Sequence, residues 1–233
     1  MKRQFLIVTA LFFLSGALFA QDINHSVEFH FTKYFDTGIE NSNIGAGLSY
    51  FLDSEKVNLK ATFNGSNVAF DFTTYAFYFP FSIHGKSTHR FGLQGIIHLE
   101  NYFEYFFETD LLANLCYKFE TQTGFSILAT GGLTFNNSVI HGLDQSLNQF
   151  SASISLKLMQ KIFDRASIYF SVSSFDDFRY PIFVTPSYLL GFDFDVTPKI
   201  KLGIEALVRA RDQFTTAPYI DYCYLTAYWR VRI

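Results

Sequence analysis

Beyond Ala20 the chain contains no apolar stretch that approaches the ~20 consecutive residues with which a helix crosses a bilayer. It also lacks any long run of like charge, and its formal net charge is only -3, so nothing in it is typical of a nucleic-acid-binding protein. Its two cysteines, Cys116 and Cys223, do not have the spacing of metal ligands, and we expect free thiols. These absences exclude a helical membrane protein and a disulfide-rich or zinc-based scaffold.

Aromatic residues, in contrast, are abundant. The chain has 233 residues, which suits one domain, and it contains 30 Phe and 14 Tyr in a composition that is 49% hydrophobic. A soluble domain rarely carries so much aromatic surface without a helical pattern to bury it. An element other than a helix must therefore present this surface.

The N-terminus has the three parts of a secretory signal peptide. Lys2 and Arg3 precede an apolar run from Phe5 to Ala20, and the small residues Ala17 and Ala20 precede Gln21. We expect cleavage after Ala20, with Ala17 as the alternative position, and a lone membrane anchor as the less favoured interpretation of the run. The predicted organisation is a signal peptide over residues 1–20 and a single domain over residues 21–233.

A period of two residues dominates the mature chain, as in a strand whose alternate side chains lie on opposite faces. It is clearest at the C-terminus, where one face carries Cys223, Leu225, Ala227, Trp229, Val231 and Ile233 and the other carries Tyr222, Tyr224, Thr226, Tyr228, Arg230 and Arg232. Five more alternating segments precede it, back to Phe125, and further strands are expected near residues 25–35, 43–52, 56–63, 67–80, 90–100 and 110–120. One face suits lipid and the other suits water.

The connections between these segments alternate in length. Inner turns are predicted at Asp53–Lys56, Phe81–His89, Thr121–Thr123, Gln160–Arg165 and Thr197–Lys199. All but the second are tight. Outer connections are predicted at Asp36–Ser42, Asn64–Asn67, Asn101–Thr109, Asn136–Gln145, Phe175–Pro186 and Ala210–Tyr219. For Asn101–Thr109 the alternatives are a strand extension above the membrane or part of an extra strand, because Phe103, Tyr105 and Phe107 continue the outward parity. Short periplasmic turns and longer outer loops are typical of outer-membrane barrels. The fold predicted is all-β, an antiparallel transmembrane β-barrel of about 12 strands, with 10 to 14 possible.

A soluble β-sandwich or lipocalin also alternates, but the long, continuous and aromatic apolar face favours lipid. Over its mature length the chain resembles small, porin-like bacterial outer-membrane barrel proteins, through the signal peptide, the alternating strands and the C-terminal strand Tyr222–Ile233. The resemblance implies the bacterial outer membrane as location, with its lipid and the barrel assembly machinery, which reads the C-terminal strand, as partners. Members usually end in an aromatic residue, commonly Phe. This chain ends in Ile233, so that match is partial.

Candidate functional residues lie on the polar face. We expect the following to line the lumen: Glu28, His30, Lys60, Asp71, Lys118, Asp193, Glu205, Arg209, Tyr222, Tyr224, Tyr228, Arg230 and Arg232. In a closed barrel the last strand pairs with the first, so Arg230 and Arg232 would lie near Glu28. One interpretation is a structural salt-bridge network, because buried charges must be paired. The other is a solute pathway in which the arginines and tyrosines of the last two strands form a stripe for anionic or sugar solutes.

Three functions remain open. The first is a narrow porin-like channel for small polar or anionic solutes. The second is a structural or adhesive surface barrel that acts through its outer loops, and the third is a barrel-embedded lipid hydrolase. No Ser and His spacing compels the third, and His30 and His98 face the lumen by parity although such an enzyme needs its dyad turned toward the bilayer. We therefore expect no catalytic residue, metal, cofactor or nucleic-acid partner.

Overall fold

The computed structural model describes residues 23–36, 44–66, 69–102, 105–140, 146–174, 185–211 and 219–233. These residues form twelve strands: β1 (Asn24–Asp36), β2 (Ile44–Asp53), β3 (Val57–Gly65), β4 (Ala69–His84), β5 (Ser87–Tyr102), β6 (Phe106–Thr121), β7 (Phe125–Ile140), β8 (Ser146–Phe163), β9 (Ala166–Ser173), β10 (Ser187–Thr197), β11 (Ile200–Arg211) and β12 (Tyr219–Arg232). The predicted signal peptide, residues 1–20, lies outside the described residues.

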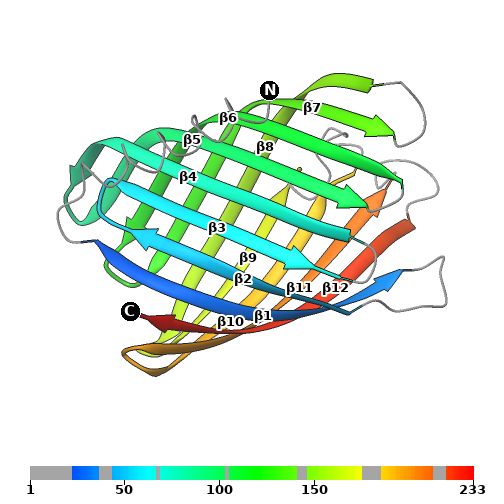
Figure 1. Ribbon diagram of the computed structural model, residues 1–233. Helices are drawn as coiled ribbons and strands as arrows, with labels where there is room; N and C mark the ends of the chain where they lie inside the picture. Colours follow the sequence, from blue (N-terminus) through cyan, green and yellow to red (C-terminus); the bar gives the residue numbers. More distant parts are fainter. Residues whose placement is uncertain are drawn as a thin grey trace.

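The strands form one closed antiparallel barrel in which each strand pairs with its neighbours in sequence and β12 pairs with β1. Figure 1 shows this junction, with β12 (red) alongside β1 (blue). The register at the junction runs from Ser26 opposite Arg232 to Asp36 opposite Tyr222. The predicted fold class and the count of twelve are confirmed. In the part of the chain that the structure describes, no helix is long and apolar enough to span a bilayer.

The two faces of the wall differ sharply in polarity. Exposed large apolar side chains include Phe31, Leu48, Phe63, Leu93, Leu115, Leu133, Phe170, Leu190, Leu202 and Leu225. Buried polar side chains include Glu28, His30, Ser49, Gln94, Asp110, Asn114, Thr134 and Ser153. Among the described residues, Ile96 and Leu112 with Tyr75 packed against them form a small apolar cluster on the inner face. This arrangement is the reverse of a soluble barrel and matches a barrel surrounded by lipid.

The turns at one end of the barrel, hereafter the turn end, are all short. The connection between β4 and β5 is only residues 85–86, shorter than the predicted Phe81–His89. The cause is a bulge, because the β4–β5 register shifts between Tyr78 and Phe81. Tyr78 and Phe81 are both exposed although three residues apart, which breaks the period of two and made the end of β4 look like a loop.

The wall is taller on one side of the barrel. Strands β4 to β7 have 16 residues each and β8 has 18, whereas β9 has 8. Because a tilted strand crosses the hydrocarbon layer with about 9–11 residues, these strands extend well past it. Parts of the predicted loops Asn101–Thr109 and Asn136–Gln145 are therefore strand. Polar residues suggested a loop at Asn136–Gln145, but Ser138 donates a 2.9 Å hydrogen bond to Glu108, and Asn137 one of 2.8 Å to Asn148.

The junction between β1 and β12 contains a buried hydroxyl pair. Thr32 Oγ1 and Thr226 Oγ1 are 2.8 Å apart. We expect Thr226→Val to destabilise the barrel by about 1 kcal/mol, because it leaves the Thr32 hydroxyl without its partner. The double variant Thr32→Val plus Thr226→Val should recover most of that loss, since both polar groups are then removed. Urea unfolding of the refolded protein in vesicles measures both, and additive losses in the double variant would contradict the pairing.

Candidate functional site

The predicted lumen residues all alternate with the exposed apolar residues of their strands, which places them on the inner face. They come from β1 (Glu28, His30), β3 (Lys60), β4 (Asp71), β6 (Lys118), β10 (Asp193), β11 (Glu205, Arg209) and β12 (Tyr224, Tyr228, Arg230, Arg232). The side chain of Tyr222 lies outside the described residues. Arg232 is exposed near the end of β12, at the turn end of the barrel. The structure divides most of the others among separate groups rather than along one continuous stripe.

The first group is at the β1–β12 junction. Arg230 donates to Glu28 Oε2 through Nε at 2.9 Å and Nη2 at 2.6 Å. Its guanidinium also lies 3.8 Å from the centroid of the Phe51 ring on β2. The predicted proximity of Arg230 to Glu28 is therefore observed, and this arginine is a paired charge that stacks on a ring.

The second group joins tyrosines to carboxylates on β9 to β12. Tyr169 donates a 2.5 Å hydrogen bond to Glu205 Oε1, and its hydroxyl is 3.1 Å from that of Tyr228. Tyr228 in turn donates to Asp193, whose other oxygen is 3.2 Å from Lys201 Nζ. Glu205 thus has Tyr169 as its partner rather than an arginine of β12. Sequence reasoning placed Tyr169 on the polar face but did not single it out.

Both tyrosines of this group lie flat against the wall over a glycine. Tyr169 is paired with Gly191 on β10, and Tyr228 is paired with Gly203 on β11. A Cβ added at either glycine would overlap the ring of the tyrosine opposite it. The rings can therefore extend along the wall instead of across the lumen. The signal in the sequence is an inward glycine directly opposite an inward aromatic residue, and it can be recognised only once the register is known.

The third group is acidic and lies at the loop end of β3 to β5, opposite the turn end. Asn64 Oδ1 accepts a hydrogen bond from His30 Nε2, and Asn64 Nδ2 donates one of 2.8 Å to Asp71 Oδ1. On β5, His98 is 2.8 Å from the Thr73 hydroxyl. The two predicted residues in this group, His30 and Asp71, are thus joined through one asparagine.

The acidic group continues on β6 and β7. Asn136 donates a 2.6 Å hydrogen bond to Asp110, and Ser138 donates to Glu108. Glu108 and Asp110 were not predicted as lumen residues. Glu108 was assigned to an outer connection, and Asp110 was placed at the first residue of the strand that follows it. Each carboxylate has a donor, as buried charge requires. Among the described residues no set of three His, Cys, Asp or Glu could hold a metal ion.

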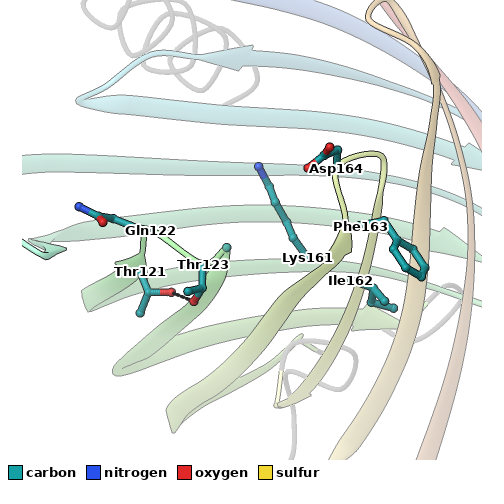
Figure 2. A pocket seen from close by; sticks show the side chains of 8 residues that line it. Thr121, Gln122, Thr123, Lys161, Ile162, Phe163 and Asp164 are labelled. Atoms are coloured by element: carbon teal, nitrogen blue, oxygen red, sulfur yellow. Dashed lines mark hydrogen bonds between the residues drawn. The ribbon is translucent and has the colours of Figure 1, made fainter.

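The turn end carries paired charges and one polar groove. Lys118 Nζ is 2.9 Å from Glu120, and Arg90 is 3.5 Å from the same residue. Figure 2 shows the groove, which encloses about 400 Å³ between the β6–β7 and β8–β9 turns. Its lining is Thr121, Gln122, Thr123, Gly124, Lys161, Ile162, Phe163 and Asp164. The hydrogen bond between the Thr121 and Thr123 hydroxyls lies within one turn and stabilises that turn.

The closed barrel with an apolar exterior and a polar interior has the fold of outer-membrane β-barrels. No protein-family model and no curated protein matches the sequence. Among solved structures, the KdgM porin in complex with disordered oligogalacturonate is similar, with a TM-score of 0.54 and 8% identity over 88% of this chain and 98% of that chain.

Two further similar structures are an outer membrane channel from Pseudomonas putida F1 and the outer membrane phospholipase A from Escherichia coli. The channel has a TM-score of 0.47 and 9% identity, covering 92% of this chain and 97% of its own. The phospholipase has a TM-score of 0.46 and 10% identity, covering 90% of both chains. At such low identity these likenesses describe the fold alone.

Proposed function

We propose that this protein is a narrow, passive channel of a bacterial outer membrane that conducts small polar or anionic solutes through the barrel lumen. The observation that carries the proposal is the inner face, which holds polar and charged side chains of both signs instead of a packed apolar core. A polar and charged inner face is the lining that a solute path through a barrel requires. The proposal includes export by a signal peptide cleaved after Ala20 and assembly through the C-terminal strand.

Two details of the interior support a solute path. The side chains of Glu100, Lys118, Lys201 and Arg230 keep 25–29% of their surface accessible, although they point inward. The inward rings of Tyr169 on β9 and Tyr228 on β12 lie along the wall over glycines. A polar lining of this kind determines which solutes a pore admits. The KdgM porin, which has the same fold, was solved with an oligogalacturonate, an acidic saccharide.

A surface barrel that acts through its outer connections is the second candidate, and the tall wall of β4 to β8 favours it. Strands that extend past the hydrocarbon layer would hold their connections above the membrane surface. The His30 and His98 side chains bond inside the barrel to Asn64 and Thr73, so neither is turned toward the bilayer as the base of a lipid hydrolase would be.

Electrical recording in planar bilayers tests the channel. Mature protein refolded in detergent should produce stepwise current increments in KCl, because ions can follow the charged lumen. Heat-modifiable mobility on gels provides the control that the sample is a folded barrel. A folded, inserted protein that gives no increments would contradict the channel and favour the surface barrel.

A further inference from the structure

Two lysines of the inner face rest on aromatic rings instead of forming ion pairs with carboxylates. Lys60 is on β3 and Lys157 is on β8. In the ring of twelve strands, β3 and β8 lie on nearly opposite walls. The Lys60 ammonium lies 5.3 Å from the centroid of the Phe51 ring, and the Lys157 ammonium lies 4.1 Å from that of Tyr169. Each cation therefore rests on an aromatic ring inside the barrel.

Neither ammonium has a carboxylate partner among the described residues. Salt bridges within 4.0 Å are formed by Arg90, Lys118, Lys201 and Arg230, but not by Lys60 or Lys157. A cation–π contact offsets only part of the cost of removing an ammonium from water. Neither lysine is therefore neutralised by a direct ion pair with a described carboxylate.

The nearby carboxylates are already engaged by other donors. Glu205 and Asp193 interact electrostatically with Lys157, but Glu205 accepts from Tyr169, and Asp193 accepts from Tyr228 and Lys201. Lys60 also interacts electrostatically with Lys157, so charges from opposite walls act on each other within the lumen. Like charges brought together in this way repel, and a bound anion would remove that repulsion.

We propose that Lys60 and Lys157 form an anion-binding site across the lumen, which takes a small solute bearing carboxylate or phosphate groups. Phe51 and Tyr169 hold the two ammonium groups, while Arg230, paired with Glu28, contributes positive charge beside Phe51. This inference rests on the proposed function and names its solute class. Neither lysine was assigned such a role from the sequence.

Inorganic phosphate is the probe, and the mature protein in planar bilayers is the sample. We expect millimolar phosphate to reduce the chloride current of the wild type. The double variant Lys60→Gln plus Lys157→Gln should need about tenfold more phosphate for the same reduction, because each ammonium supplies charge-assisted hydrogen bonds. The Lys60→Arg plus Lys157→Arg variant should retain the block. Lys199→Gln is the matched control, since it removes an exposed lysine of the turn between β10 and β11, outside the lumen.

A second measurement does not depend on conduction. Phosphate should raise the thermal unfolding temperature of the detergent-solubilised wild type and of Lys199→Gln, but not that of the double glutamine variant, because a ligand stabilises only the state that binds it. An equal phosphate effect on the wild type and the double glutamine variant would overturn the site. A wild type that shows this stabilisation but conducts no current would refute the channel and leave the site intact.

Discussion

Replacing Gly203 with leucine should lower the single-channel conductance at least about twofold, because it drives the Tyr228 ring off the wall and into the pore. A Cβ at this position overlaps the ring, so the ring must rotate. The rotation breaks the hydrogen bonds from Tyr228 to Asp193 and Tyr169. Overpacking of this kind also costs about 1–3 kcal/mol of stability. Conductance histograms and urea unfolding measure the two effects.

Gly95 provides the matched control for this experiment. It lies on the outward face of β5 between Leu93 and Ile97, and a Cβ there would meet nothing within 4 Å. Gly95→Leu should therefore leave conductance unchanged. The Gly203→Leu variant combined with Tyr228→Ala should regain conductance, because the displaced ring is gone. If Gly203→Leu conducts like the wild type, Tyr228 does not help to define the width of the pore.

An arginine on the outer face should have the largest effect on stability. Ile204 lies in the middle of β11 and is 45% exposed in the isolated chain. If lipid covers it, Ile204→Arg costs about 2–4 kcal/mol, the range for a cation near the bilayer midplane. The free energy of unfolding in vesicles measures this loss.

Ile204→Leu is the control, because it changes shape but keeps an apolar residue, and its expected loss is small. In a soluble barrel the arginine would instead be a solvated surface residue with little effect. Equal stability of the two variants, with a protein that stays in solution without detergent, would show that water rather than lipid faces β11.

The sequence predicted the fold because its strongest signal, the period of two, is a property of the strand itself. It failed where the strand departs from that period. The bulge between Tyr78 and Phe81 shifts the alternation within β4, and so the end of this strand was assigned to a turn. Polar runs such as Asn136 to Ser138 were assigned to a connection because their partners, Asp110 and Glu108, come from a different strand.

The candidate site was predictable only in part. The pairing of Arg230 with Glu28 followed from closure of the barrel, which brings the last strand against the first. The role of Tyr169 required the register, since it depends on Gly191 opposite and Glu205 two strands away. Whether a lysine forms an ion pair depends on distances between side chains of different strands, and the pattern of residues along the sequence does not give these distances.

The seam between β1 and β12 also has a kinetic consequence. Every other strand pair joins neighbours in the chain, whereas the seam joins residues such as Thr32 and Thr226, which are 194 positions apart. The entropic cost of closing so long a loop must be met before these contacts form, and such distant pairings slow folding. Local hairpins can form early, but each intermediate exposes two unpaired strand edges until the ends of the polypeptide meet. The chain is therefore most vulnerable to aggregation in the intermediates that precede the formation of this seam.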